Sequence, residues 1–224
     1  MNKITTKDKS ITYHSEEYDE AYHSITGAKE EAIKKYAEPT KIAELAKKGS
    51  ISILDVCFGI GYNSAAAIDA ARKANPNCAI SIVALEIDIR ILNEIPKLEN
   101  VFEHYGIFQN MIRQNSPLIK DSTTIFVQDN VEVQLLIGNA LKTIKLVNGS
   151  FDAVFLDPFS PKKCPELWTA DFFKEIHKRI NKGAILATYS CARSVRDNLK
   201  RAGFTVKDGP TIGRRGPSTI AIRS

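Results

Sequence analysis

The side chain that is best suited to do chemistry is an aspartate at the end of an apolar run. Asp157 follows the strand-like segment Phe151 to Leu156 and is followed at once by Pro158 and Phe159. Because proline fixes its own backbone φ angle, this loop holds the carboxylate in place. Methyl transfer to an amine needs a neutral nitrogen and a group that takes up the released proton. Asp157 is therefore a candidate catalytic and cofactor-facing residue, with a helix-capping role as the alternative, and Pro158 and Phe159 are candidates to contact the acceptor.

A glycine-containing turn is the second candidate. The apolar run that begins at Ile53 leads into Phe58-Gly59-Ile60-Gly61 and then into a helical pattern that starts at Asn63. Glycine allows a backbone to approach a ligand, and cofactors of doubly wound folds lie outside the carboxyl ends of the strands. We expect Phe58, Gly59, Gly61 and Asn63 to bind a cofactor, although a turn that binds nothing has the same pattern. Asp55, four residues before Gly59, would bind the cofactor or order the turn.

An acidic residue at the end of the next strand narrows the choice of cofactor. Glu86 ends the run Ala84-Leu85-Glu86, where a carboxylate can accept both hydroxyls of a ribose. Ser64 stands where dinucleotide-binding turns have their third glycine, which favours S-adenosylmethionine over NAD. After a third strand, Asn139 and Ala140 would either meet the adenine amino group or form a plain helix N-cap.

Strands and helices must alternate to position these residues. From residue 49 onward, short apolar runs alternate with longer amphipathic ones, which predicts an α/β fold with a mostly parallel, seven-stranded sheet and helices on both faces. The predicted strands are Ser52 to Cys57, Ile80 to Glu86, Val131 to Ile137, Asp152 to Asp157, Ala184 to Tyr189, Phe204 to Lys207 and Ser218 to Arg223. The predicted helices are Asn63 to Lys73, Ile89 to Leu98, Tyr105 to Asn115, Asn139 to Leu146, Thr169 to Ile180 and Ala192 to Ala202.

Two further segments complete the predicted architecture. Thr123 to Val127 and the strand at Val131 to Ile137 flank a tight polar turn, which predicts a hairpin. Residues 1–48 are rich in helix formers after a polar, aromatic lead, and we expect them to form a helical cap on the substrate side. The sequence thus predicts one methyltransferase-sized domain over residues 1–224, with the cap at 1–48 and a Rossmann-like core at 49–224.

Composition and charge restrict the remaining function classes. The 224 residues are 43% hydrophobic and 25% charged, as in folded proteins and unlike disordered ones. No apolar run approaches the roughly 18 to 20 residues of a membrane span, and the N-terminus lacks a secretion signal, so we expect a cytoplasmic protein with no membrane partner. The four cysteines include no CxxC pair, and we expect no metal.

Residues 160–224 hold 14 Lys/Arg against 5 Asp/Glu, whereas residues 1–159 hold 17 Lys/Arg against 21 Asp/Glu. A basic C-terminal part suits RNA.

Several motifs together resemble one enzyme family. The sequence is similar to the MnmC-like family of tRNA wobble-uridine methyltransferases in Phe58-Gly59-Ile60-Gly61-Tyr62-Asn63 and in Leu156-Asp157-Pro158-Phe159-Ser160-Pro161 with Pro165-Glu166-Leu167-Trp168-Thr169. The resemblance extends to the runs from Tyr18 to Ser24 and from Gly27 to Glu31 and to the C-terminal Gly213-Arg214-Arg215. It departs from the family pattern at Asp55, Cys57, Asn139 and Pro158, and the last departure leaves the substrate open.

The resemblance implies a function and a set of roles. It implies S-adenosylmethionine-dependent N-methylation of the aminomethyl group of a modified wobble uridine in tRNA, without the FAD-binding oxidase half of the bacterial fusion proteins and without DNA as a partner. Glu31 would lie close to the cofactor. The implied tRNA contacts include Lys162, Lys163, Arg214 and Arg215, and the wider basic surface would add Arg193, Arg196, Lys200 and Arg201.

Two other functions stay open at this point. One is a small-molecule amine transferase, either an aminopropyltransferase of the spermidine synthase type or a methyltransferase of free amines. Lys162 and Lys163 follow Asp157 closely and would repel a polyamine, which counts against it. The other is a non-catalytic RNA-binding module, which would need neither Glu86 nor Asp157 at a strand end.

Overall fold

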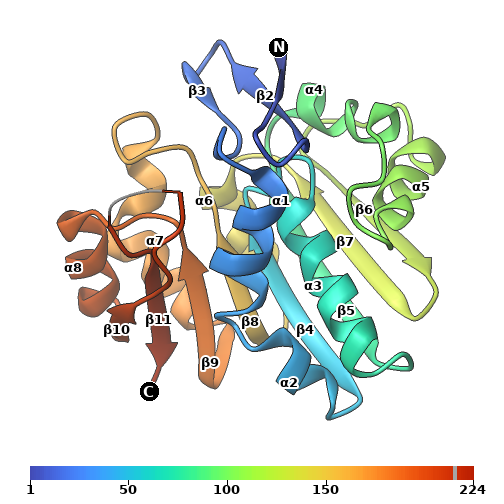
Figure 1. Cartoon of the computed structure of the whole chain (residues 1–224). Helices are drawn as coiled ribbons and strands as arrows, with labels where there is room; N and C mark the ends of the chain where they lie inside the picture. The colour runs from blue at the N-terminus through green and yellow to red at the C-terminus, as the bar shows by residue number, and fades with distance from the viewer. Residues whose placement is uncertain (214–215) are drawn as a thin grey trace.

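A central sheet of eight strands forms the middle layer of the molecule (Figure 1). The computed structural model describes residues 1–213 and 216–224. The strand order in the sheet is β10-β11-β9-β8-β4-β5-β7-β6. In chain order these strands are β4 (Ser50–Val56), β5 (Ala79–Glu86), β6 (Ser122–Gln128), β7 (Val131–Ile137), β8 (Phe151–Leu156), β9 (Ile180–Thr188), β10 (Phe204–Asp208) and β11 (Thr219–Arg223).

Most neighbouring strands of this sheet are parallel. β9, β8, β4, β5 and β7 run in one direction, whereas β11 and β6 pair antiparallel with their neighbours. The α/β fold and the mostly parallel sheet are therefore confirmed. The sheet has one strand more than the seven predicted, because β6, the first strand of the predicted hairpin, extends the edge beside β7.

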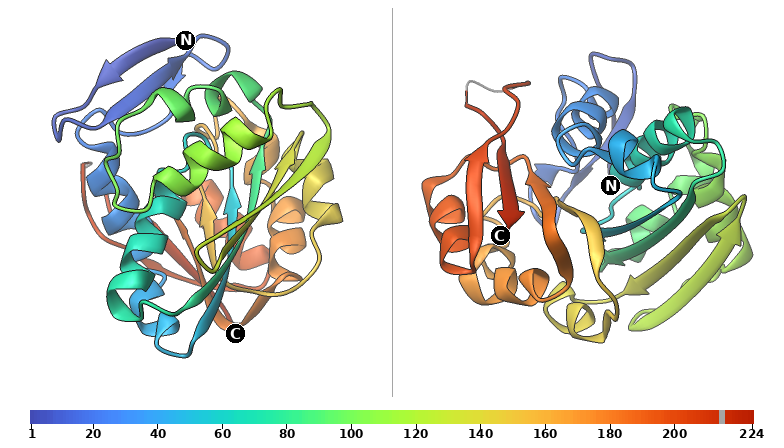
Figure 2. Two further views of the ribbon diagram at one scale, coloured as in Figure 1. Left: turned by 90° about the vertical axis from the view of Figure 1, so that its right-hand side faces the viewer. Right: turned by 90° about the horizontal axis from the view of Figure 1, so that it is seen from below.

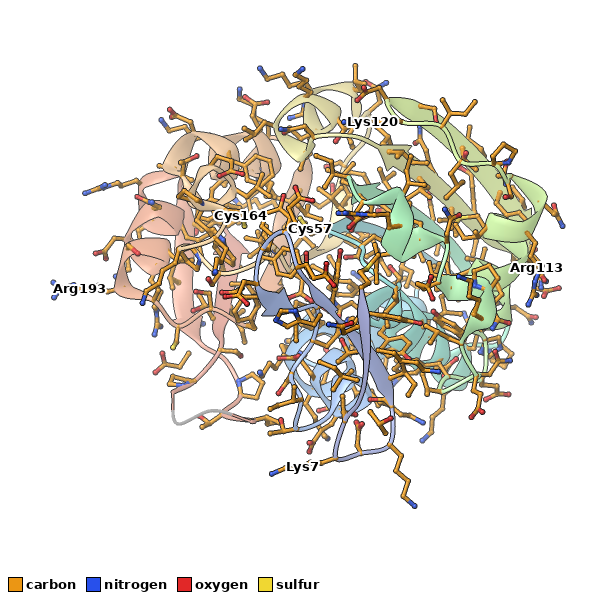
Figure 3. The ribbon with its side chains drawn as sticks, turned by 90° about the horizontal axis from the view of Figure 1, so that it is seen from above. Lys7, Cys57, Arg113, Lys120, Cys164 and Arg193 are labelled. Atoms are coloured by element: carbon orange, nitrogen blue, oxygen red, sulfur yellow. The ribbon has the colours of Figure 1, made fainter. Side chains whose placement is uncertain are left out.

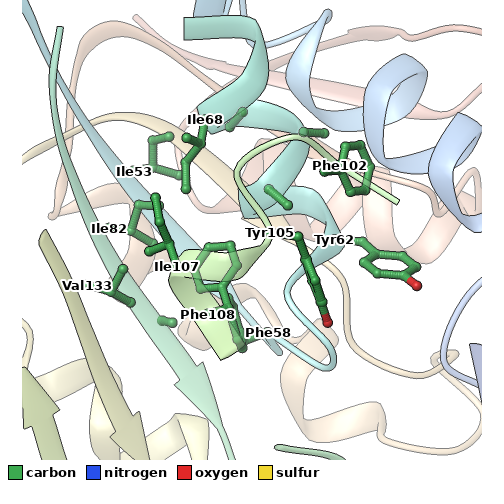
Figure 4. Close-up of a cluster of buried hydrophobic side chains, with 14 of the residues drawn as sticks. Ile53, Phe58, Tyr62, Ile68, Ile82, Phe102, Tyr105, Ile107, Phe108 and Val133 are labelled. Carbon is green, nitrogen blue, oxygen red and sulfur yellow. The ribbon is translucent and has the colours of Figure 1, made fainter. Parts of the chain in front are cut away.

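The central strands are apolar on both faces because helices cover both. In β4, Ile51 and Ile53 join one hydrophobic core, and Leu54 and Val56 join the other. This alternation is the strand period of two, and burial on both faces is typical of parallel sheets. Figure 4 shows the first core, where Phe58 packs edge to face against Phe108 with ring centroids 5.2 Å apart.

The helices form the two outer layers (Figures 1 and 2). One face carries α1 (Ala28–Glu31), the π-helix η1 (Ala32–Ala37), α2 (Ile42–Ala46), α3 (Tyr62–Ala74), α4 (Ile89–Leu92), the 3-10 turn η2 (Ile95–Lys97) and α5 (Gly106–Gln114). The other face carries α6 (Ala140–Thr143), η3 (Ile144–Leu146), η4 (Pro165–Trp168), α7 (Ala170–His177) and α8 (Arg193–Arg201). Within the described residues, no helix is long and apolar enough to span a membrane.

The N-terminal segment differs from the expected helical cap. Helices do begin at Ala28, and a break follows Ala37 where Pro39 interrupts the pattern. Residues 2–21, however, form a second antiparallel sheet of β1 (Asn2–Thr5), β2 (Ile11–Ser15) and β3 (Glu20–Ala21). The helical prediction was wrong there because strands this short are set by pairing with each other, and their alternation is too brief to read from sequence.

This small sheet lies above the carboxyl edge of the central sheet, as the view in Figure 3 shows. Cys57 and Cys164 mark the middle of that edge in the figure, and Arg193 of α8 lies at the outer rim. The carboxyl ends of β4, β5, β7 and β8 all point to the same edge because these strands are parallel. The topology therefore brings the predicted site residues together beneath the N-terminal segment.

Candidate active site

A cavity of about 630 Å³ lies between the carboxyl edge of the central sheet and the N-terminal segment. Residues after β4, β5, β7 and β8 form one wall, and residues 18–26 with Glu31 form the other. Its volume is in the range of small-molecule sites, about 300 to 1,000 Å³. Of the predicted site residues, those that line it are Glu31, Phe58, Gly59, Glu86, Asn139, Ala140, Asp157, Pro158 and Phe159.

The glycine turn brings a strand, a helix and the cavity together. Gly59 lines the cavity with a φ of +58°, and Gly61 begins α3 with a φ of +78°. A Cβ atom at Gly61 would lie 2.5 Å from Cζ of Phe58, so this position excludes larger residues. Gly61 does not itself line the cavity, and its role is to let the chain turn beneath Phe58.

Glu86 connects this turn to the end of β5. Its Oε2 accepts a hydrogen bond from the backbone N–H of Gly59 at 2.7 Å, and its Oε1 accepts from the N–H groups of Ile87 and Asp88 at 2.8 and 2.9 Å. Burial raises the pKa of Glu86, and these backbone hydrogen bonds oppose the shift. The carboxylate is thus fixed in the cavity wall.

Asn139 takes the capping role that its position allowed and also lines the cavity. Its Oδ1 accepts a hydrogen bond from the N–H of Leu141 at 2.9 Å, which caps α6. Asn139 and Ala140 also line the cavity, opposite the turn that carries Gly59. The cap holds the start of α6 against the space that a nucleoside would fill.

Asp157 is held by donors on both of its oxygens. The hydroxyl of Tyr36 donates to Oδ1 at 2.5 Å, and Nδ2 of Asn63 donates to Oδ2 at 2.9 Å. Burial, followed by the negative charge of Glu31, raises the pKa of Asp157 to about 7, although both hydrogen bonds act in the opposite direction. A carboxyl group with this pKa in a cavity can both take up and release a proton near neutral pH.

The loop after Asp157 is braced from several sides. The hydroxyl of Tyr189 donates to the carbonyl oxygen of Pro158 at 3.0 Å, and Nε1 of Trp168 donates to that of Phe159 at 2.8 Å. The ring of Tyr18 stacks on Phe159 with centroids 4.5 Å apart. The loop is therefore fixed to both the sheet and the N-terminal segment.

The N-terminal wall contains Tyr22, a candidate that the sequence reasoning missed, and Glu31, which the resemblance placed close to the cofactor. The hydroxyl of Tyr22 donates to Oδ2 of Asp88 at 3.0 Å. Glu31 accepts from Nζ of Lys35 at 2.7 Å in a buried ion pair and also from the N–H of Ser24 at 2.7 Å. The only signal for Tyr22 was its place in the run from Tyr18 to Ser24, which resembles a family motif but gives Tyr22 no individual role.

Other predicted residues lie outside the cavity lining. Asp55 is fully buried, its Oδ2 accepts from the hydroxyl of Ser64 at 2.6 Å, and burial raises its pKa to about 8, so it orders the turn from beneath. Asn63 reaches the site only through Asp157. Lys162 and Lys163 do not line the cavity, and Nζ of Lys163 lies 3.4 Å from Oδ2 of Asp19. Arg214 and Arg215 lie outside the described residues.

The charge of the cavity corrects one argument from the sequence. Six acidic residues line it, and the described part of the chain contributes neither lysine nor arginine to the lining. The acidic residues are Glu20, Glu31, Glu86, Asp88, Asp157 and Glu166. The inference that Lys162 and Lys163 make the site repel polyamines is therefore wrong, because neither lysine lines the cavity and the acidic groups that do line it attract cations. Over the described residues, no group of three or more His, Cys, Asp or Glu side chains could hold a metal ion.

The comparisons with known proteins agree on one family. Residues 103–224 match the family described as S-adenosyl-L-methionine-dependent methyltransferase. An uncharacterized protein of Methanocaldococcus jannaschii is 32% identical over 99% of this chain and 59% of its own length. The bifunctional protein MnmC of Pseudomonas entomophila, named for tRNA 5-methylaminomethyl-2-thiouridine biosynthesis, is 27% identical over 90% of this chain and 32% of its own length. The chain thus spans between a third and three fifths of these relatives.

A solved structure gives the same result. The crystal structure of MnmC2 from Aquifex aeolicus matches with a TM-score of 0.83 and 35% identity, and the match covers 100% of this chain and 70% of that one. The likeness thus includes the N-terminal segment as well as the sheet, and with it both walls of the cavity. On its fold, on the matched residues and on this likeness, the chain belongs to the S-adenosyl-L-methionine-dependent methyltransferases of the MnmC type.

Proposed function

We propose that the protein methylates the aminomethyl group of a modified wobble uridine in tRNA. The observation that carries the proposal is the position of Asp157, a cavity carboxyl group with a pKa of about 7 and a donor on each oxygen. Such a group can hold an ammonium through a charge-assisted hydrogen bond and take up its proton. The MnmC relatives, named for the synthesis of a methylaminomethyl wobble nucleoside, support tRNA as the acceptor.

S-adenosylmethionine fits the residues of the sheet wall. Glu86 would hold its ribose, Gly59 and Phe58 would lie against it, and Asn139 and Ala140 would face its adenine, as the positions of these residues in the cavity wall support. When bound, the cofactor supplies a methyl group on a positively charged sulfur. Glu31 adds negative charge at the other end of the cavity, where cationic parts of either ligand would be attracted.

The remaining steps belong to side chains of this chain. Asp157 binds the amine, removes a proton from it and leaves the nitrogen lone pair open for the new carbon–nitrogen bond. Pro158 and Phe159 orient the acceptor, since their carbonyl groups are fixed by Tyr189 and Trp168. The cavity wall carries negative charge, so the phosphates of tRNA must stay outside it and only the modified base can enter.

Basic residues outside the cavity would bind those phosphates. Arg196 already has a close acidic partner in Asp208 at 2.6 Å, whereas Lys163 pairs only at 3.4 Å with the exposed Asp19. Lys162 adjoins the loop of Asp157, whereas Arg193 lies at the outer rim of the sheet edge in Figure 3. We therefore assign the main contacts to Lys162 and Lys163, together with Arg214 and Arg215 from the sequence. A flat dependence of tRNA affinity on salt, or unchanged affinity after charge reversal at Arg214 and Arg215, would contradict this assignment.

A small cationic amine is the second candidate acceptor. The six acidic residues of the cavity favour it, because a polyamine or free amine would be attracted by the same charges. This alternative needs no basic surface at the rim, so the two candidates differ in their dependence on Lys162 and Lys163.

Methyl transfer from labelled S-adenosylmethionine tests both candidates. The acceptors are bulk tRNA that lacks wobble methylation and, separately, spermidine and putrescine. We expect label in a wobble nucleoside with the wild-type protein and a decrease of about 100-fold or more with Asp157→Ala, the usual size of a lost general base. Asp152→Asn is the matched control, because Asp152 lies at the opposite end of β8 and binds Ser52 and Asn181. Label in the polyamines alone would replace the tRNA proposal with the second candidate.

A further inference from the structure

We propose that Tyr36 is a positioning residue for Asp157. Together with Asn63, Tyr36 orients the carboxylate of Asp157 and stabilises its charged form. The proposal deepens the proposed function, since it concerns the group that handles the proton of the acceptor amine. It assigns a role to a tyrosine that lies 121 residues from Asp157 in the sequence.

The two hydrogen bonds of Asp157 determine how its carboxylate is oriented. Tyr36 donates to Oδ1 at 2.5 Å and Asn63 to Oδ2 at 2.9 Å, and the two donors come from different helices, η1 and α3. Each carboxylate oxygen can accept about two hydrogen bonds, so each retains one lone pair for a ligand. Because both oxygens are held, rotation of the carboxylate about its last bond is restricted, and each oxygen keeps a lone pair on a residue that lines the cavity.

The π-helix explains how Tyr36 reaches this position. Residues Ala32–Ala37 follow α1 in a wider turn, which the N–H of Glu38 closes on the carbonyl of Ile33 at 2.9 Å. Tyr36 is fully buried, and its ring packs edge to face on Phe155, two residues before Asp157, with centroids 5.9 Å apart. Packing on the same strand therefore fixes the hydroxyl beside the carboxylate. Short π-helical segments frequently occur at functional sites.

Other titratable groups near Asp157 act on the same proton. Glu31 of α1 raises the pKa of Asp157, and Lys35 of η1, which is paired with Glu31 at 2.7 Å, lowers it. Asp55 of β4 and Cys57 after it also interact with Asp157, and burial raises the pKa of both of these groups, to about 8 for Asp55. Burial and Glu31 thus favour the protonated form of Asp157, and the donors Tyr36 and Asn63 with the cation of Lys35 oppose it.

The variant Tyr36→Phe tests this role with little change in shape. A hydrogen bond donated to the carboxylate stabilises its charged form, so its loss must raise the pKa of Asp157. We expect the acid limb of the pH profile of methyl transfer to move upward by about one pH unit or more, given the usual strength of hydrogen bonds to charged groups. The rate should return toward the wild-type value at pH above the shifted limb.

A second measurement does not depend on activity. In protein labelled with ¹³C at the side-chain carboxyl of aspartate, the resonance of Asp157, assigned by its loss in Asp157→Asn, reports its titration directly. We expect the same upward shift in Tyr36→Phe and in Asn63→Ala, which removes the other donor. If the wild-type protein transfers no methyl group to tRNA, the proposed function fails, and this titration still tests the role of Tyr36.

Tyr105→Phe is the matched control. Tyr105 is also fully buried, but its hydroxyl donates to the neutral carbonyl of Ile60 at 2.8 Å and not to a titrating group. Loss of the Tyr105 hydroxyl should leave unchanged both the titration of Asp157 and the acid limb of the pH profile of methyl transfer. The proposal is overturned if Tyr36→Phe lowers the rate equally at all pH values and leaves the titration of Asp157 where it is in the wild type.

Discussion

The two walls of the cavity are built by different means. In the sheet wall, Glu86 and Asn139 are fixed by backbone N–H groups, which belong to their own turns except for the N–H of Gly59 in the turn after β4. In the N-terminal wall, Tyr18 and Tyr22 are fixed by side chains that belong to distant parts of the chain. Glu86 and Asn139 are thus held by turns at the sheet edge, whereas the N-terminal wall, like the carboxylate of Asp157, depends on side chains from distant parts of the chain.

This difference divides the recognition of the two ligands. We infer that the sheet wall presents backbone groups and the carboxylate of Glu86 to a nucleoside, an arrangement that doubly wound folds share. The N-terminal wall supplies aromatic rings and the buried pair of Glu31 and Lys35 around the reacting group. We infer that changes in the sheet wall act on cofactor affinity and that changes in the N-terminal wall act on the acceptor and on the proton.

The largest effect is expected in the sheet wall, from Glu86→Gln. The carboxylate of Glu86 accepts backbone N–H groups on both of its oxygens. Glutamine has only one acceptor oxygen, so its NH₂ group would face one of these N–H donors. We expect affinity for S-adenosylmethionine, measured by calorimetry, to fall by about 100-fold, as hydrogen bonds to a charged group are lost. Glu132→Gln on the exposed face of β7 is the control. Equal affinities in the wild type and Glu86→Gln would remove Glu86 from the cofactor site.

A smaller effect is expected in the N-terminal wall, from Tyr18→Ala. The stacked pair of Tyr18 and Phe159 braces the loop after Asp157, and such ring pairs contribute up to about 1.5 kcal/mol. We expect the KM for the acceptor to rise by up to about 10-fold while cofactor affinity stays the same. Tyr18→Phe keeps the ring and should behave as the wild type. A loss of cofactor affinity in Tyr18→Ala would break the division between the walls.

The smallest effect is expected at the rim, from Lys163→Gln. The ion pair of Lys163 with Asp19 spans the two walls, but Asp19 is 78% exposed, and such surface pairs contribute about 1 kcal/mol or less. We expect unchanged thermal stability and cofactor affinity and a decrease of about one in the salt slope of tRNA binding. Lys182→Gln, on β9, is the matched change of charge. A salt slope that falls equally in both variants would mean that Lys163 has no special role.

The sequence by itself determined the parallel sheet and the residues at its carboxyl edge. Apolar runs mark the strands, and a parallel sheet places every following turn at the same edge, so Gly59, Glu86, Asn139 and Asp157 had to lie near one another. The backbone position of each residue follows from its own strand and turn, which are local in the sequence, although the donors that hold Asp157 come from distant parts of the chain. The motif resemblance then added the cofactor that such an edge binds.

Only the tertiary structure decided which side chains face the cavity and which lie beneath or outside it. Asp55 and Gly61 belong to the same motif as Gly59 but lie behind the turn, and Lys163 points to Asp19 instead of the cavity. The partnership of Tyr36 with Asp157 joins residues 121 positions apart. Contacts of this kind depend on how the N-terminal segment packs over the sheet edge, and no local pattern of residue types encodes that packing.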